Sequence, residues 1–499
     1  MSSTPPKLVL CVIDAMAPAM LERAVAAGAA PVLKTLIERG RYIPNCVAAF
    51  PSVTPVCAAS IVTGVAQDVH RIPAMNWFHR DEDRYVEYGS SFRAAQRFGI
   101  ARQLTDTVYN MNRAHLSSEA LTVFEVLDDA DVRTAGTTYL MYRGRHRHEP
   151  QRDTALTRVA STLMRHPVMG PRELFYADIF ASRRTGCRSG LGMPGVRDRH
   201  SGCVSSYLVE QDLFDFLLLS LPDNDWYSHK YGPDAQIQSI AQADLQLARV
   251  FEASGGIDEF LSEHAVIAMA DHSQAPIART IALQDDLAEL GVRGPSRSSG
   301  SPRGEEPRIA VCPSQRAAMV YALHESERDA MRASVVTRAL SVEGVEHVMW
   351  LAHDAHDAPS EGVLSSPVHG ELRFCPGGPL EDPRGVRWSV EGPLAVIGAT
   401  VRDGRLHTPA YPDVLARVWS ALACPTSGEV LLSAGSGYEF IDWGRQAHVG
   451  GGSHGSLHAD DSLGALVLCG VALPEQEPAQ WAIRDIAPLV LGHFGISSG

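Results

Sequence analysis

The sequence predicts an α/β protein with a mainly parallel central sheet, helices on both faces of that sheet, and inserted cap-like segments. Short runs of consecutive apolar residues, such as KLVLCVI at 7–13, are typical of strands buried on both faces, as in parallel sheets. Stretches with apolar residues at helical spacing alternate with these runs, which is typical of helices that cover such a sheet. The length of 499 residues suits a large α/β enzyme built on one decorated core.

The expected elements follow one another along the chain. The strand at 7–13 precedes a helix that begins at Pro31 and has Gly40 as its C-cap. A second strand at 42–50 leads through the turn FPSVTP to a helix from about Val56 to Gly64, and a further helix lies between 232 and 255. Buried strands are also expected at FDFLLLSL (near 215–221), HAVIAMA (264–270) and ALVLCGV (465–471).

We expect one core over 1–499, with insertions between its elements at about 80–210 and 275–435. The first insertion is rich in arginine and histidine and lacks a run of buried strands. The second contains a loop of Gly, Ser, Pro and Arg at 293–306 that is expected to be mobile. The segments after this loop favour a β-rich cap: RIAVCPS, AAMVYAL, EHVMWLA, LAVIGAT and VLLSAG.

The composition restricts the class of binding partner and the cellular compartment that we expect for this protein. A formal net charge of −14 would repel a phosphate backbone, so nucleic-acid binding is not expected. Nine cysteines, an odd number without a C-x-x-C pair, predict reduced thiols in a cytoplasmic protein. No apolar run approaches the roughly 18 residues of a membrane-spanning helix, and the N-terminus lacks the pattern of a signal peptide, so no membrane association is expected.

Seven side chains stand where apolar, strand-like runs end. Carboxylates and imidazoles are the ligands that a pair of divalent metals needs, and such a pair can activate a hydroxyl as a nucleophile. Together they predict a metal-dependent phosphoester hydrolase. The seven residues are Asp14, Thr54, Asp225, His229, Asp271, His272 and His454.

Each position also has a simpler interpretation when it is taken alone. Asp14 follows a buried strand, where α/β sheets form their sites, but it could equally be the N-cap of the next helix. Thr54 at a helix start places its hydroxyl at the positive end of the helix dipole, although threonine before proline is an ordinary cap. Ser52 and Ser60 are local alternatives to Thr54 as nucleophile.

The remaining ligands have competitors nearby. Asp225 and His229 are four residues apart, so a helical turn would bring both to one side, but Asp223 competes for the same role. Asp271 and His272 directly follow AVIAMA, which is not the usual chemistry of a solvated turn. His454 lies in the glycine-rich loop GGGSHGSLHADDS, where His448 and His458 are alternatives.

Taken together, the seven residues are stronger evidence for a metal site than any one of them, because they complete two coordination shells. One metal would bind Asp14, Asp271, His272 and the oxygen of Thr54. The other would bind Asp225, His229 and His454, and three protein ligands with an open position are the catalytic pattern of zinc. Manganese, iron or calcium are alternatives, because carboxylate-rich shells accept harder ions.

The same residues carry a family resemblance. The chain resembles the alkaline phosphatase superfamily, and within it the type I phosphodiesterase/nucleotide pyrophosphatase branch. The resemblance covers about 7–75, 213–275 and 440–475. Its motifs are VIDAM, FPSVTP with TG nine and ten residues after Thr54, D-x-x-x-H-x-x-GPD, ADHSQ, and a final H-G before a buried strand.

The resemblance implies an alkaline phosphatase-like fold and a two-zinc site in which Thr54 is the nucleophile and the other six residues are ligands. In this family an asparagine after a short H-G-I-like segment contacts the phosphoryl oxygen. Here the segment is HRIPAMN, with Arg71 in place of glycine and with Asn76 one position later than the family pattern. The sulfatase pattern C-x-P-x-R is not present at Cys57, which lies in CAASI.

The predicted activity is hydrolysis of a small phosphoester or nucleotide-like substrate, as a phosphodiesterase or nucleotide pyrophosphatase. A phosphonate hydrolase and a phosphoryl transferase or mutase are alternatives on the same site. A non-catalytic binding module is disfavoured because the ligand set is complete. Arginines of the first insertion are candidates for substrate contacts, although most such arginines are solvated; they are Arg143, Arg145, Arg183 and Arg184.

Overall fold

A mixed α/β fold with a large central sheet is seen in the computed structural model, which describes residues 5–152, 154, 157, 158, 160, 161, 164–295, 306–352 and 361–497. Most of the loop expected to be mobile, at 293–306, lies outside these residues. The central sheet has eight strands. Their order is β2 (Arg41–Val47), β25 (Leu463–Cys469), β11 (His264–Met269), β1 (Lys7–Ile13), β10 (Phe216–Leu221), β5 (Thr134–Thr137), β8 (Glu173–Tyr176) and β9 (Phe180–Ala181).

The middle of this sheet is parallel and its margins are not. Strand β1 pairs in parallel with β10 and β11, and the parallel pairing continues from β10 through β5 to β8. Strand β25 is antiparallel to both β11 and β2, and β9 is antiparallel to β8. The expected strand at 465–471 is therefore present, but it runs against the parallel core.

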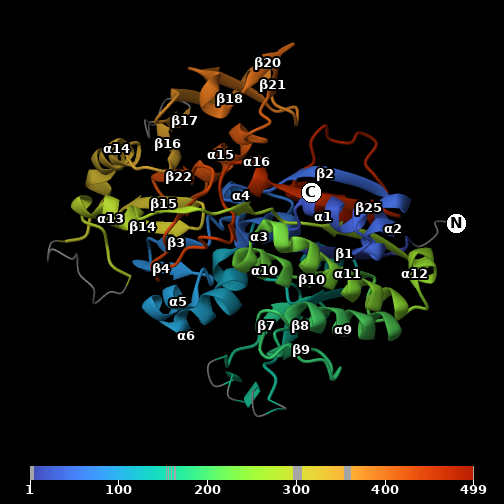
Figure 1. Cartoon of the computed structure of the whole chain (residues 1–499). Coiled ribbons are helices and arrows are strands. Elements are labelled where there is room, and N and C mark those ends of the chain that lie inside the picture. The colour runs from blue at the N-terminus through green and yellow to red at the C-terminus, as the bar shows by residue number, and fades with distance from the viewer. Residues whose placement is uncertain are drawn as a thin grey trace.

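The apolar runs of the sequence are explained by burial on both faces of the sheet. Along β1, Leu8, Leu10 and Val12 belong to one core and Val9, Cys11 and Ile13 to the other. One core includes residues of α3 (Thr54–Thr63), α7 (Val123–Asp129) and α17 (Ile486–His493). The other includes residues of α1 (Pro18–Ala26), α2 (Pro31–Arg39), α9 (Arg197–Glu210), α11 (Gln236–Glu252) and α12 (Ile257–Glu263), of which α9, α11 and α12 lie together in Figure 1.

Two predicted helices match the structure closely in position. Helix α2 begins at Pro31, and Gly40 is its C-cap with an extended backbone conformation. Helix α3 begins at Thr54, two residues before the predicted start, and ends at Gly64 in the left-handed conformation that glycine favours. This early start places Thr54 in the first turn of the helix.

The expectation that residues 80–210 lack buried strands is wrong. Strands β5, β8 and β9 come from this segment and complete one side of the central sheet. They escaped the sequence pattern because they are short, and because β5 (TAGT) has no apolar run although all its residues are buried. A second correction concerns LAVIGAT, where Leu394–Ile397 forms a 3-10 helix instead of a strand.

A second sheet occupies most of the segment expected to be β-rich. Its strands run in the order β14 (Ile309–Ser314), β15 (Ala317–Ala322), β22 (Val430–Ala434), β16 (Val345–Ala352), β17 (Glu361–Ser366), β18 (Gly370–Glu381), β21 (Arg405–His407) and β20 (Thr400–Arg402), with β19 (Arg387–Glu391) paired to β18. All neighbours are antiparallel except β18 and β21. Figure 1 shows β18, β20 and β21, in orange, at one end of the molecule.

One pair of cysteines corrects the prediction of reduced thiols. Cys187 and Cys203, at a sequence separation of 16, form a disulfide. The bond joins the segment that precedes α9 to the middle of that helix. A count of cysteines could not show this pairing, because it depends on the loop folding back onto α9. No helix among the described residues is both long enough and apolar enough to cross a membrane.

Candidate active site

The seven predicted residues converge at one edge of the central sheet. Asp14 directly follows β1, and Asp271 and His272 follow β11 after a single residue. Asp225 and His229 lie on α10 (Asp223–Tyr231), which begins just after β10, and Thr54 opens α3. His454 follows the short strand β24 (Gly452–Ser453). The carboxyl ends of neighbouring parallel strands meet at one edge, so residues distant in sequence become neighbours here.

One group surrounds His272. Its Nε2 atom lies 3.5 Å from Oδ1 of Asp14 and 3.4 Å from Oδ2 of Asp271. The hydroxyl oxygen of Thr54 is 3.3 Å from the same nitrogen. Asp14, Asp271 and His272 are buried and could together hold a metal ion. This is the first group that the sequence predicts.

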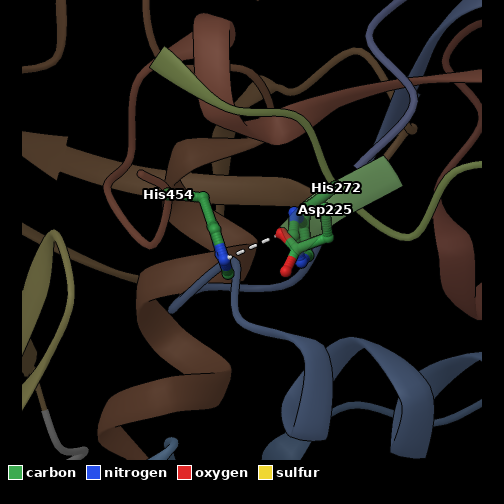
Figure 2. Close-up of side chains that lie close together, drawn as sticks. All are labelled: Asp225, His272 and His454. Atoms are coloured by element: carbon green, nitrogen blue, oxygen red, sulfur yellow. Dashed lines mark ion pairs between the residues drawn. The ribbon is translucent and has the colours of Figure 1, made fainter. Parts of the chain in front are cut away.

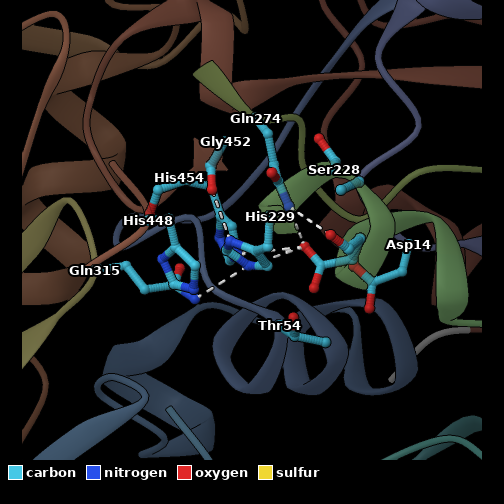
Figure 3. Close-up of polar contacts among 12 residues, drawn as sticks. Asp14, Thr54, Ser228, His229, Gln274, Gln315, His448, Gly452 and His454 are labelled. Carbon is cyan, nitrogen blue, oxygen red and sulfur yellow. Dashed lines mark hydrogen bonds and ion pairs between the residues drawn. The ribbon is translucent and has the colours of Figure 1, made fainter. Parts of the chain in front are cut away.

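The second group surrounds Asp225. Its Oδ1 atom lies 3.4 Å from Nε2 of His229 and 3.5 Å from Nε2 of His454. The two histidine nitrogens are 3.2 Å apart, and Figure 3 shows the rings side by side. Asp225, His272 and His454 also lie close enough to share an ion, as Figure 2 shows. The two predicted groups are therefore adjacent, and His272 lies at their boundary.

All three histidines are oriented in the same way. The Nδ1 atom of His229 donates to the carbonyl oxygen of Gly452 at 2.8 Å, that of His454 to Ser52 at 2.6 Å, and that of His272 to Ser273 at 3.1 Å. A proton held on Nδ1 leaves the lone pair of Nε2 free to face the site. Histidines that bind metals almost always donate their other ring nitrogen in this manner.

The electrostatics of the site favour a bound cation. Burial raises the pKa of Asp14 well above its usual range, and the nearby carboxylates of Asp271 and Asp225 raise it further. Burial lowers the pKa of His454, and the adjacent His272 and His229 lower it further. Oδ1 of Asp14 is buried and accepts no hydrogen bond from the described residues. Crowded carboxylates beside neutral imidazoles fit divalent metal ions, which would relieve this repulsion.

Two glutamines support the second group and were missed by the sequence analysis. Gln274 donates from Nε2 to Oδ1 of Asp225 at 2.5 Å, and Nε2 of Gln315 lies 3.5 Å from Nε2 of His229. Gln274 lies in the motif ADHSQ, two residues after the predicted ligand His272, and this closeness in sequence could have indicated that it supports the site. Gln315 comes from the turn between β14 and β15, and nothing in its sequence context indicates the site.

The competing residues have other partners. Asp223 accepts hydrogen bonds from the backbone of Gly195 and from Nε of Arg197, at 2.8 and 2.9 Å. His448 is bound to Glu439 at 2.7 Å, although its ring packs 4.1 Å from that of His229. The other three competitors also bind elsewhere: His458 pairs with Glu346, Ser60 contacts His70, and Ser52 accepts from Gly455 and donates to Ser456.

The amide nitrogen of Asn76 is held by contacts outside the predicted ligand set, whereas its Oδ1 atom is buried and has no hydrogen-bond partner within the described residues. Its Nδ2 atom donates to the carbonyl oxygen of Pro313 at 2.6 Å and lies 3.4 Å from the hydroxyl of Ser90. It opens β3 (Asn76–His79), and successive residues of an extended chain point to opposite sides. The preceding residue, Met75, lines the cavity beside the site, whereas Asn76 does not. These contacts describe a residue that joins β3 to the second sheet.

Arg143, Arg145 and Arg183 of the first predicted insertion have carboxylate partners. Arg143 and Arg145 both bind Glu125, at 2.9 Å in each case. Arg183 binds Glu173 at 2.6 Å. None of the four candidates, Arg184 included, lines the cavity beside the site.

Comparison with known proteins identifies the family of this chain. Residues 8–359 match the family described as type I phosphodiesterase/nucleotide pyrophosphatase. None of the curated proteins matches the sequence. The phosphonoacetate hydrolase of Sinorhizobium meliloti 1021, solved with phosphonoacetate, is similar in structure with a TM-score of 0.56 and 17% identity, over 98% of this chain and 96% of that chain.

Two mammalian structures are similar over the same extent. Human ectonucleotide pyrophosphatase/phosphodiesterase 5 has a TM-score of 0.55 at 12% identity, and an inactive murine variant in complex with AMP has 0.57 at 11%. Both comparisons cover 99% of this chain and 96% of the other. Because the family match covers residues 8–359, more than half of the chain, it shows that this chain belongs to the type I phosphodiesterase/nucleotide pyrophosphatase family of the alkaline phosphatase superfamily and is a hydrolase of that type.

Proposed function

We propose that the chain hydrolyses small phosphoesters, as a phosphodiesterase or nucleotide pyrophosphatase, with two divalent metal ions bound and with Thr54 as the nucleophile. The observation that carries this proposal is the position of Thr54. Its hydroxyl opens α3, contacts Nε2 of His272, and borders the cavity that Asp14, Asp225 and Asp271 also line.

Two sets of residues would hold the metal ions, for which zinc is the best candidate. Asp14, Asp271, His272 and the Thr54 hydroxyl form one set, and Asp225, His229 and His454 form the other. Bound divalent ions would lower the pKa of the threonine hydroxyl and neutralise charge on the phosphoryl oxygens. Among the described residues that line the cavity, Arg197 is the one lysine or arginine, and its guanidinium binds Asp223.

With the metal ions bound, hydrolysis would proceed in two steps through Thr54. The oxygen of Thr54 attacks phosphorus, the bond to the leaving oxygen breaks on the opposite side, and the proton of the hydroxyl leaves with the departing alcohol. Water then attacks the phosphothreonine, which releases the phosphate product and restores the hydroxyl. The first turn of α3 directs the positive end of its dipole toward this charge, which favours an anion beside Thr54.

A phosphonate hydrolase and a phosphoryl transferase or mutase remain as alternatives on the same site. The phosphonoacetate hydrolase among the similar structures supports the first of these. The murine neighbour with AMP supports a nucleotide-like substrate, and its inactive form carries a threonine-to-alanine substitution. We place the phosphodiesterase reaction first because the family match covers most of the chain.

We further propose one catalytic core that includes the central sheet, with the second sheet as an insertion near 275–435. In support, the named strands at 309–434 pair with one another within the described residues, and the isolated bridge between Ile309 and Val292 also stays within 275–435. The cytoplasmic location stays a prediction. The Cys187–Cys203 disulfide counts against it, because structural disulfides persist mainly in oxidising compartments.

The test compares bis-p-nitrophenyl phosphate with p-nitrophenyl phosphate as substrates of the zinc-loaded protein. We expect the diester to be preferred, Thr54→Ala to lose activity, and metal analysis to find close to two ions per chain. Thr337→Ala is the matched control, because Thr337 lies on α14 (Arg328–Ala339), is exposed, and binds only a backbone carbonyl of its own helix. Full activity of Thr54→Ala would disprove the nucleophile, and release of phosphate only with an added alcohol would favour the transferase.

A further inference from the structure

A second cavity, of about 250 Å³, lies outside the candidate active site, and no described residue lines both cavities. Helix α14 contacts β16 beside it, as Figure 1 also shows. Four parts of the chain form its wall: Arg80, which directly follows β3; Arg328 and Arg332 of α14; Leu351 of β16; and the segment 425–429, between α15 (Val414–Leu422) and β22. The tertiary fold, and not one local motif, therefore brings these arginines together.

Strand β15 separates this cavity from the candidate active site. Just before the strand, the backbone N–H of Arg316 donates to the carbonyl oxygen of His454 at 2.9 Å. At the far end, the backbone N–H of Ala322 donates to Oε2 of Glu429, which lines the second cavity, at 2.7 Å. A strand of six residues is about 20 Å long. A small ligand in this cavity would therefore be distinct from a phosphoryl group at Thr54.

Positive charge dominates among the described residues that line the second cavity. The side chains of Arg80, Arg328 and Arg332 are 33%, 35% and 18% exposed. The one carboxylate among these lining residues is Glu429, whose Oε1 lies 2.6 Å from Nη2 of Arg80 and 3.4 Å from Nε of Arg328. Three guanidinium groups against one carboxylate leave a surplus of two positive charges.

Two of these arginines have hydrogen-bonding capacity to spare. Nε of Arg328 is buried and has no hydrogen-bond partner within the described residues. Arg328 also lies 3.8 Å from Glu325, and Arg332 pairs with Asp329 at 2.9 Å, but both carboxylates are largely exposed on the surface. Pairs with such exposed carboxylates are screened by water and salt, so they compensate little of the charge in the cavity. Partly buried guanidinium groups without a full set of acceptors favour a bound oxyanion.

The contacts of Arg80 fix one side of the cavity. Its Nη1 atom donates to the carbonyl oxygen of Ser427 at 3.0 Å, and its guanidinium lies 4.9 Å above the ring of Tyr321. The carboxylate of Glu429 is fixed in turn by Arg80 and by the backbone of Ala322. Groups that are already ordered lose little conformational freedom when a ligand binds.

We propose that the second cavity binds the dianionic phosphate group of a small molecule, either inorganic phosphate or a phosphate monoester, through Arg80, Arg328 and Arg332. A phosphate monoester carries a charge of about −1.5 to −2 at pH 7, which matches the surplus of two positive charges. Planar guanidinium groups bind phosphate oxygens through pairs of parallel hydrogen bonds. Binding here does not depend on the proposed function. With that function, the cavity favours the monoester product over the diester substrate, because a diester carries a single charge.

Calorimetric titration of the full chain, metal-loaded and metal-free, tests the proposal. Phosphate bound at the metal ions is lost on chelation, whereas phosphate in the second cavity stays, because no candidate metal ligand lines it. We expect inorganic phosphate or methyl phosphate to bind the metal-free chain with a dissociation constant of about 1 mM or lower, and dimethyl phosphate at least about tenfold more weakly. The tighter of the first two identifies the free ion or a monoester as the ligand. Loss of all binding on chelation, or equal binding of dimethyl phosphate, overturns the proposal.

Substitutions on α14 locate the bound anion. Arg328→Gln and Arg332→Gln should each weaken phosphate binding about tenfold or more, because each removes charge-assisted hydrogen bonds. Arg338→Gln is the matched control: Arg338 lies on the same helix, is exposed, and does not line the cavity. Melting temperatures are measured on the same samples. A lower melting temperature with unchanged phosphate affinity in Arg328→Gln and Arg332→Gln would assign both arginines a structural role and overturn the proposal.

The charge of the ligand gives an independent measurement. A phosphate group takes up its second proton with a pKa of about 6, whereas sulfate remains a dianion. Lowering the pH from about 7.5 to about 5 should therefore weaken phosphate about tenfold relative to sulfate. The ratio of the two affinities removes the effect of protein groups that titrate in this range. An unchanged ratio would show that the cavity does not select a dianion, which contradicts the proposal.

Discussion

The hydroxyl oxygen of Thr54 lies 3.3 Å from Nε2 of His272, although 218 positions separate the two residues in the sequence. Thr54 begins a helix on one face of the central sheet, and His272 follows strand β11 of that sheet. Their contact brings the proposed nucleophile against the proposed metal ligands. Every prediction about the reaction therefore depends on the packing of α3 against the sheet.

Substitution of Thr54 by residues of similar shape separates its hydroxyl from its volume. Thr54→Val keeps the shape and removes the oxygen, and we expect kcat/KM for the diester to fall by about 10³-fold or more. Thr54→Ser keeps the oxygen and should retain a substantial part of the activity. Steady-state kinetics on both variants check this, with circular dichroism to show that each is folded. Equal losses in the two variants would contradict a role for the hydroxyl.

Asp225 and Asp223 form a matched pair, because they are two residues apart and only one faces the site. Asp225→Asn should weaken metal binding by about 10-fold or more, since it removes charge from a ligand that His229 and His454 approach. Asp223→Asn should keep the metal, because Asp223 binds the start of α9 instead. Metal titration followed by calorimetry measures both. A larger loss in Asp223→Asn would reverse our assignment.

Asn76→Ala should affect stability more than catalysis. The substitution removes the hydrogen bond to Pro313 and leaves a buried carbonyl oxygen without its partner, so we expect the free energy of unfolding to fall by about 1–3 kcal/mol. The kcat of the folded enzyme should change by less than about threefold, in contrast to the role that the family pattern implies. Denaturant unfolding and kinetics on the same preparation decide between the two, and a hundredfold loss of kcat would restore Asn76 to the reaction.

Asp413 should make the protein less stable as the pH rises from about 4 to 6. Burial raises the pKa of this carboxyl from 3.8 to about 6, and the neighbouring Asp382 adds to the shift, while Arg484, Arg384 and Arg417 oppose it. The folded state therefore holds a proton that the unfolded state has released in this range, and stability present below pH 3.8 is lost as the pH passes 6.

The comparison with Asp413→Asn isolates this effect, because the amide does not titrate. The stability of the wild type relative to the variant should fall by up to about 3 kcal/mol across this pH range. Urea unfolding at a series of pH values measures the difference. A difference that stays constant with pH would show that Asp413 remains ionised in the folded protein.

The disulfide between Cys187 and Cys203 predicts a count of thiols. The oxidised protein should have seven reactive thiols after denaturation, since seven cysteines are free, and nine after reduction. The double variant Cys187→Ser/Cys203→Ser should unfold more easily by about 2–4 kcal/mol, because a cross-link restricts the unfolded chain. Nine thiols without reductant would show that the chain is reduced and would support the cytoplasmic prediction.

Most of the buried strands were predictable because the residues within each strand are themselves apolar. After Lys7 and His264, which begin them, the runs at 7–13 and 264–270 are apolar at every position, as is typical of a strand covered on both faces. Strand β5 was not predictable, because TAGT owes its burial to its neighbours β10 and β8 and not to its own side chains. The same reason explains the antiparallel direction of β25, which no local pattern encodes.

The sequence by itself determined the strands of the core that are apolar in their own residues, and it determined the candidate ligands of the site, since each ligand follows a strand-like run within its own segment. Only the tertiary structure decided which neighbours serve that site. It set Asp223 aside by binding it to α9, turned Asn76 toward Pro313, and brought Gln274 and Gln315 to the ligands. These outcomes depend on contacts between segments far apart in the chain, where the direction of a side chain follows from packing and not from its own sequence.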